Sequence, residues 1–145
     1  MKVFCDTNVI VAAFLRGHPH HNRARPVLER IKAGQDQGFV AAHSLAEIYA
    51  VLTRLPGASQ VAPTIAWRLI SENVVKNFTT VALTSKEYAQ TLEKAAADGV
   101  EGGKTYDSLL LAAAAKSEVD RIYTGNVRHF QGLAEEQLRS RITAP

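Results

Sequence analysis

Short apolar runs alternate along this chain with longer segments in which apolar residues recur every three or four positions. The short runs, rich in β-branched and aromatic residues, predict β-strands at residues 2–5, 39–42, 79–83 and 121–124. The longer segments predict helices at residues 7–15, 27–34, 44–55, 64–75, 85–97 and 105–117. Because strands alternate with helices, the pattern indicates an α/β fold whose small, mostly parallel sheet is flanked by helices.

The predicted helices differ in how much apolar surface they carry. Segment 105–117, rich in Ala and Leu, is apolar almost all round, which predicts a central helix. Trp67 shares a helical stripe with apolar neighbours, which favours a packing role. Residues 17–26 are predicted as a loop leading into a helix, and residues 125–130 as a turn. One further helix presents a single apolar stripe, made of Leu45, Ile48, Tyr49 and Leu52.

Composition sets the broad class of the protein. The chain has 145 residues, of which 46% are hydrophobic and 21% charged, so we expect one globular domain over residues 1–145. No apolar run approaches the ~18 residues typical of a transmembrane helix, and no signal peptide is evident. The single cysteine, Cys5, excludes an internal disulfide and favours a reducing, cytoplasmic location. The net charge of +3 is compatible with a polyanionic partner.

Four polar residues follow predicted strands or begin predicted helices: Asp6, Glu47, Asp107 and Asn126. In open α/β sheets, ligands bind at the carboxyl ends of the strands, so these positions are the candidates for a site. Each acid also has a purely structural interpretation. Asp6 fits a helix N-cap, Glu47 fits a capping box with Ser44, and Asp107 fits the favourable dipole of a first helical turn behind a Thr105 cap.

A second capping-box match shows the limit of the pattern. Thr84 and Glu87 have the same spacing after a strand, and we interpret Glu87 as structural. Spacing alone therefore does not separate Glu47 from Glu87.

The functional alternative is that Asp6, Glu47 and Asp107 converge. Three crowded carboxylates repel one another unless a cation lies among them. Oxygen-only ligands suit a hard cation such as Mg²⁺ or Mn²⁺, which activates water and stabilises the charge of a phosphodiester displacement. A phosphatase that uses Asp6 as a nucleophile ranks lower, because such enzymes usually carry a second acid two residues on, where this chain has Asn8.

Four blocks of the sequence resemble a known family. The blocks "FCDTNVIVAAF", "SLAEIYAVLTRLP", "GGKTYDSLLLAAAA" and "IYTGNVRHF" are similar, in order and spacing, to those of PIN domains, in particular the VapC-type ribonuclease toxins of toxin–antitoxin pairs. The resemblance covers nearly the whole chain. It implies a PIN-like α/β/α sandwich and a Mg²⁺- or Mn²⁺-dependent endoribonuclease, that is, a hydrolase of RNA phosphodiester bonds.

The resemblance also assigns roles to residues. Asp6 and Asp107 would be the principal metal ligands, and Glu47 would complete the acidic cluster. Asn126 stands where the family often has an aspartate, which removes one negative charge and weakens a second metal position. Thr124 would orient a water or a ligand through its hydroxyl.

Two cationic residues near the acids are candidates for substrate contacts. Lys104 and Arg128 lie close in sequence to Asp107 and Asn126, which favours contacts to RNA phosphates. The histidines of the predicted loop are interpreted as solvated rather than metal-binding; they are His18, His20 and His21.

The resemblance further implies protein partners. These are a VapB-like antitoxin, whose C-terminal segment would cover the acidic groove, and a second copy of the chain in a homodimer. The substitution at Asn126 keeps one alternative function open. In that alternative, the chain is a catalytically weak or silent module that binds RNA or an antitoxin.

Overall fold

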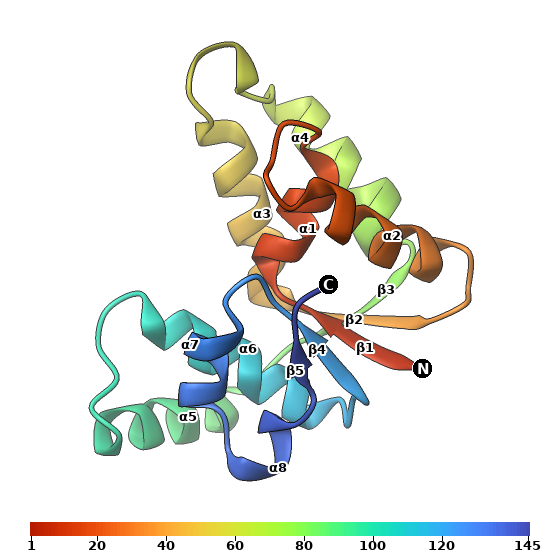
Figure 1. The fold of residues 1–145 in the computed structure, drawn as a ribbon. Helices are drawn as coiled ribbons and strands as arrows, with labels where there is room; N and C mark the ends of the chain where they lie inside the picture. Colours follow the sequence, from red (N-terminus) through yellow and green to blue (C-terminus); the bar gives the residue numbers. More distant parts are fainter.

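The computed structural model describes residues 1–145, and a five-stranded parallel sheet lies at its centre. The strands are arranged in the order β3-β2-β1-β4-β5, so β1 is central and flanked by β2 and β4 (Figure 1). Their bounds are β1 Lys2–Cys5, β2 Gln37–Ala41, β3 Phe78–Val81, β4 Arg121–Tyr123 and β5 Ile142–Thr143. The predicted α/β fold with a mostly parallel sheet is confirmed.

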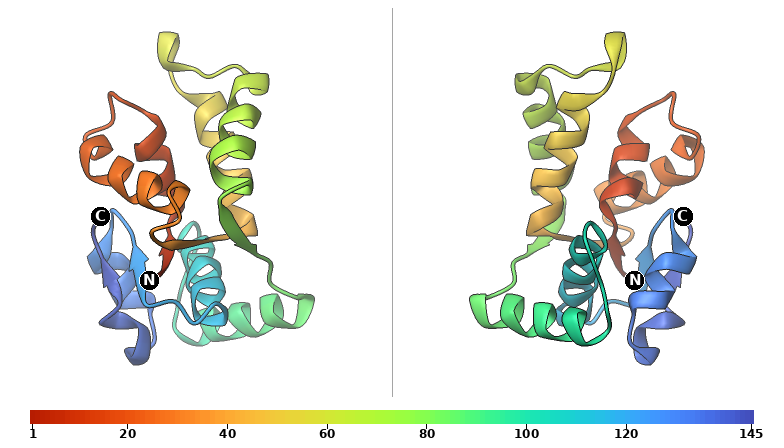
Figure 2. Two further views of the ribbon diagram at one scale, coloured as in Figure 1. Left: turned by 90° about the vertical axis from the view of Figure 1, so that its right-hand side faces the viewer. Right: turned by 90° about the vertical axis from the view of Figure 1, so that its left-hand side faces the viewer.

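Helices cover both faces of the sheet. Helices α1 to α4 lie on one side, and α5 to α8 lie on the other (Figure 2). The bounds of the first group are α1 Thr7–Phe14, α2 His21–Lys32, α3 Ala42–Arg54 and α4 Pro63–Ile70. Those of the second group are α5 Ser85–Ala97, α6 Lys104–Lys116, α7 Val127–Leu133 and α8 Glu136–Arg139. A 3₁₀ turn, Gly57–Ser59, precedes α4, and a π-helical turn, Ser71–Val75, follows it.

The sheet has a separate hydrophobic core on each face. Val3 and Cys5 pack into the core shared with α1 to α4, whereas Phe4 packs into the core shared with α6 and α7. This division follows from the alternation of side chains along a strand. Burial of both faces also explains why the strands read as continuous apolar runs.

Helices α3 and α4 form a two-helix arm that extends beyond the sheet (Figure 2). Ile48 and Leu52 are fully buried, as the predicted stripe requires, but Tyr49 is 40% exposed. Trp67 is 56% exposed, so its predicted packing role is not met within the chain. Tyr49 therefore lies outside the buried stripe and Trp67 outside the core, because the arm has packing partners on only one side. Packing of Trp67 against a second copy of the chain stays a prediction.

Helix α2 begins earlier than the sequence pattern predicts. It starts at His21, and Pro26 lies inside it. The ring Nδ1 of His21 lies 2.9 Å from the carbonyl oxygen of Ala12 in α1, and Ala24 is fully buried. These tertiary contacts stabilise the first turn, so His21 belongs to the core rather than to a solvated loop.

The C-terminal part contains two helices and a strand that the pattern does not predict. Residues 125–130 were predicted as a turn, but α7 begins at Val127 and is anchored by the buried Phe130. The last strand, β5, has two residues and pairs with β4. Elements this short give little periodic signal. None of the helices is both long enough and apolar enough to cross a membrane.

Candidate active site

Asp6 lies at the carboxyl end of the central strand, with only 2% of its surface exposed. The hydroxyl of Thr124, which follows β4, donates a hydrogen bond of 2.9 Å to Asp6 Oδ2. The main-chain N–H of Asp6 donates to the carbonyl of Tyr123 at 2.9 Å. The end of one neighbouring strand, β4, therefore fixes both the backbone and the carboxylate of this residue.

The predicted N-capping role of the Asp6 side chain is met only in part, because the backbone N–H of Asn8 lowers the pKa of the carboxyl without forming a full capping bond. Asp6 does occupy the N-cap position of α1, but its carboxylate makes no capping hydrogen bond. Its carbonyl oxygen instead accepts the first helical bond, from the N–H of Val9 at 3.0 Å. The bond from Thr124 is the one side-chain hydrogen bond that the carboxylate accepts.

The charge of Asp6 is poorly stabilised. Burial is the main reason that the pKa of its carboxyl is raised to about 6, and the charges of Asp107 and Glu47 act in the same direction. The hydrogen bond from Thr124 lowers the pKa but does not compensate. The three acids predicted as a cluster therefore interact electrostatically at this edge of the sheet.

Glu47 reaches across from α3 to α1. Its Oε1 lies 3.1 Å from the Thr7 hydroxyl, and that hydroxyl lies 2.9 Å from Ser44 Oγ. The predicted capping box is wrong, because α3 begins at Ala42 and Ser44 is already inside the helix. His43, one helical turn before Glu47, places its Nε2 3.6 Å from the carboxylate.

Asp107 lies in the first turn of α6, as predicted. The N-cap is Gly103 and makes no side-chain bond, so the predicted Thr105 cap is wrong. Asp107 Oδ2 lies 2.8 Å from Nε2 of His129, on α7. The ring of Tyr106 stacks on that of His43, with centroids 5.0 Å apart and planes 8° apart. Helices α3, α6 and α7 therefore contact one another through side chains next to the acids.

The remaining predicted residues lie beside the acids or at the surface. Thr124 is fully buried, and its hydroxyl accepts a bond of 3.1 Å from the N–H of Asn126. Asn126 is the exposed N-cap residue of α7, and its amide side chain makes no capping bond. Lys104 and Arg128 are exposed in the first turns of α6 and α7, beside Asp107 and His129.

The donor chemistry fits a hard divalent cation. The acids offer only oxygen atoms, the donors that such a cation prefers, and the charges of Asp107 and Glu47 add to the effect of burial in raising the pKa of Asp6. No three histidine, cysteine or carboxylate side chains stand close enough to form a ready-made metal site. Each acid is instead held by a neighbour: Asp6 by Thr124, Glu47 by Thr7 and Asp107 by His129.

Sequence reasoning named Thr124 as a site residue but missed the other side chains that contact these acids. Thr7 is adjacent to Asp6, and His43 precedes Glu47 by four positions, a spacing that places two side chains on one helix face. Those signals were available. His129 carried no such signal, because α7 itself was not predicted.

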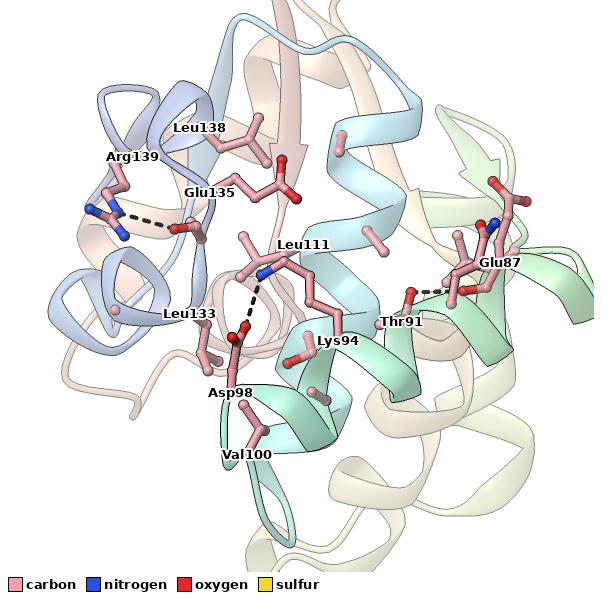
Figure 3. A pocket seen from close by; sticks show the side chains of 18 residues that line it. Glu87, Thr91, Lys94, Asp98, Val100, Leu111, Leu133, Glu135, Leu138 and Arg139 are labelled. Carbon is pink, nitrogen blue, oxygen red and sulfur yellow. Dashed lines mark hydrogen bonds and ion pairs between the residues drawn. The ribbon is translucent and has the colours of Figure 1, made fainter.

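A large cavity of the molecule lies away from the acids. A groove of about 590 Å³ between α5, α6 and α8 is lined by eighteen residues, half of them hydrophobic (Figure 3). Lys94 and Asp98 in its wall pair with each other at 2.8 Å, and Glu87 pairs with Lys116 at 2.7 Å. These ionic groups satisfy one another, so we place the candidate site at the acids and not in this groove.

A smaller cavity is lined by residues close in sequence to Asp6 and Thr124. It has a volume of about 110 Å³ and includes Asn8 of α1 and Gly125, the neighbour of Thr124. His18, His20 and Arg23 also line it. The cationic side chain of Arg23 therefore shares a cavity with Asn8 and Gly125.

Comparison with known sequences gives concordant matches. The family model described as PIN domain matches residues 3–136. Ribonuclease VapC40 from Mycobacterium tuberculosis is 32% identical over 123 residues, which cover 85% of this chain and 85% of that protein. Ribonuclease VapC27 from the same organism is 32% identical over 116 residues, which cover 79% of this chain and 78% of that protein.

Solved structures show the same fold. The crystal structure of Mycobacterium tuberculosis VapC20, a sarcin–ricin loop cleaving toxin, aligns with a TM-score of 0.70 and 17% identity, covering 92% of this chain and 97% of that chain. VapBC2 from Rickettsia felis, bound to a DNA fragment from its promoter, aligns with a TM-score of 0.61 and 17% identity, covering 88% and 90%. The predicted PIN-like α/β/α arrangement is confirmed.

Proposed function

The chain belongs to the PIN-domain family, and from that premise we propose that it is the ribonuclease toxin of a toxin–antitoxin pair. The observation that carries the proposal is the buried Asp6 at the end of the central strand, whose pKa is raised to about 6 with Glu47 and Asp107 contributing. A buried carboxylate with a perturbed pKa and further acids near it, at the carboxyl edge of a parallel sheet, is typical of a catalytic site. The ribonuclease names of two relatives support RNA as the substrate.

We further propose that Asp6 and Asp107, with Glu47, hold Mg²⁺ or Mn²⁺. When bound, such an ion activates water and stabilises the charge that develops on the phosphate. Thr124 holds the Asp6 carboxylate in place through its hydroxyl, and His129 does the same for Asp107. Binding of a cation favours the ionised form of Asp6, which burial and its neighbours otherwise disfavour.

Exposed cations near the acids suit the RNA backbone. Lys104, Arg128 and Arg23 are exposed and form no ion pair within the chain, so their charges are available to phosphates. Asn126 adds a neutral amide at the same edge rather than a fourth carboxylate. The lower negative charge there reduces repulsion of RNA and favours one metal ion over two.

We also propose a VapB-like antitoxin and a second copy of the chain as partners. A structural neighbour is a VapBC complex, which supports the antitoxin. Tyr49 and Trp67 are exposed on the α3–α4 arm, and large exposed aromatic side chains favour a protein contact. We expect this activity in the cytoplasm.

Cleavage of a mixed RNA substrate tests the proposal. Wild type and Asp6→Asn are compared in Mg²⁺, Mn²⁺ and EDTA, with Glu93→Gln as the control because Glu93 is exposed on α5. We expect Asp6→Asn and EDTA each to lower the rate by about two orders of magnitude or more, while Glu93→Gln cleaves like wild type.

The opposite result would identify the alternative function. If folded, antitoxin-free wild type binds RNA but cleaves none with either metal, the chain is a silent binding module and the catalytic proposal is wrong. Cleavage that persists unchanged in both Asp6→Asn and EDTA would instead place the nuclease site elsewhere.

A further inference from the structure

Two aromatic rings from different helices stack beside the acids. Tyr106 of α6 and His43 of α3 have nearly parallel planes, 8° apart, with ring centroids separated by 5.0 Å. Tyr106 directly precedes Asp107, and His43 places its Nε2 3.6 Å from Glu47. The stacked pair therefore connects the two helices that carry two of the three acids.

About half of the surface of Tyr106 is exposed to solvent. Its exposed fraction is 49%, although His43 lies against one face of the ring. The opposite face is therefore open to solvent. Two other exposed tyrosines, Tyr49 and Tyr88, have no stacking partner in the structure. Single exposed aromatic residues are common, but one held flat by a second ring beside an acidic cluster is not explained by chance exposure.

A ring that is already oriented binds a planar group with little further loss of side-chain freedom. Stacking of bases on aromatic side chains is a general means of binding unpaired RNA, because every base has a flat π-face. A phosphate held at the acids brings its own nucleosides close to Tyr106. The position thus favours a nucleobase over a protein side chain as the occupant of the open face.

We propose that Tyr106, backed by His43, is a stacking platform for an unpaired RNA base next to the cleaved phosphate. The inference rests on the proposed ribonuclease function and adds a substrate class to it. The site takes single-stranded or looped RNA, because a base within a duplex does not expose its face. Recognition by stacking requires the ring but not the tyrosine hydroxyl.

The test compares Tyr106→Leu, Tyr106→Phe and the matched control Tyr88→Leu, an exposed tyrosine on α5. The probe is a fluorescein-labelled, unstructured RNA oligonucleotide, with the same sequence as a duplex for comparison. Binding is measured by anisotropy in EDTA, which separates it from metal-dependent cleavage. KM and kcat in Mn²⁺ give a second readout, and thermal melts check that each variant is folded.

We expect Tyr106→Leu to weaken single-strand binding, and to raise KM, by roughly 5- to 150-fold, the loss that corresponds to one stacked base. Tyr106→Phe and Tyr88→Leu should remain within about twofold of wild type, since stacking persists in one and is not involved in the other. Duplex binding should be weak and insensitive to all three substitutions.

Two results would overturn the inference while leaving the ribonuclease proposal intact. One is cleavage and single-strand binding by Tyr106→Leu that equal those of wild type. The other is a change confined to oligomeric state or antitoxin binding, which would assign the ring to a protein interface. A wild type that neither binds nor cleaves RNA would instead remove the proposed function itself, and the platform with it.

Discussion

Two segments of this chain begin alike and do different things. In each, a strand is followed by Ser or Thr and then, three positions later, by Glu. At the start of α5 the capping box forms: the Thr84 hydroxyl accepts the N–H of Glu87 at 3.2 Å, and the Glu87 carboxylate accepts the N–H of Thr84 at 2.8 Å. In α3 the helix begins at Ala42, so Glu47 lies beyond the first turn and faces Thr7 of α1 instead.

The two carboxylates differ in the charges around them: one has a cationic partner and the other does not. Glu87 accepts a hydrogen bond from Lys116 at 2.7 Å, and this bond is the main reason that its pKa is lowered to about 2. Glu47 has no lysine or arginine partner and instead adds to the raised pKa of Asp6. An acid whose charge is satisfied within the chain supports the fold, whereas acids that destabilise one another form a site that awaits a cation.

The largest stability effect that this comparison predicts concerns Asp6 and pH in EDTA. Because the pKa of Asp6 rises from 3.8 unfolded to about 6 folded, the native state binds a proton between these values that the unfolded state has lost. Stability therefore falls as pH rises through this window, by about 3 kcal/mol from this residue. The amide of Asp6→Asn does not titrate in this range. The free energy of unfolding of the variant, relative to that of wild type, should therefore increase by that amount between pH ~4 and ~7.

Urea unfolding of the two proteins across the pH range measures this difference. Because Asp36 and Glu87 titrate in both proteins, their lowered pKa values cancel in the comparison. Parallel pH–stability curves for wild type and Asp6→Asn would show that Asp6 carries no unfavourable charge. The contrast with Glu87 would then lose its electrostatic basis.

A smaller effect should separate the two glutamates by activity. Glu47→Gln removes a charge beside the proposed metal ligands, and we expect it to lower Mn²⁺-dependent RNA cleavage on the order of 10- to 100-fold. Glu87→Gln lies at another helix start and should cleave like wild type. Equal loss of activity in both variants, with both folded, would mean that the loss reflects stability rather than the site.

The same pair shows what the sequence predicts and where it stops. Strands β1 to β4 and the whole of α5 follow from local periodicity and caps, and parallel topology was enough to bring Asp6, Glu47 and Asp107 to one edge. The start of α3 was not predictable, because Ser44 matched a cap whereas packing of Ile48 and Leu52 sets the helix register.

Long-range contacts account for the other differences. The early start of α2 depends on the contact of His21 with Ala12, and α7 depends on burial of Phe130. Likewise, His129 reaches Asp107 from 22 residues away. No local pattern encodes such partners, so sequence reasoning proposed the acids and Thr124 as site residues and missed the contacts that Thr7 and His129 make with the acids.

The smallest predicted effect concerns stability, where we expect Glu87 to matter and Glu47 not to. Glu87→Ala removes the carboxylate that accepts the N–H of Thr84 and contacts Lys116, and should lower the free energy of unfolding by a small amount, since the Thr84 hydroxyl still accepts the N–H of residue 87. Glu47→Ala removes a repulsive charge and leaves Thr7 bonded to Ser44, so its stability in EDTA should equal or exceed that of wild type.

Urea unfolding at pH 7 in low and high salt measures the stability of both variants. Because a surface ion pair contributes little and is screened, most of the Glu87 cost should persist in high salt. A cost that vanishes in salt would mean that Lys116, and not the cap, gives Glu87 its structural role.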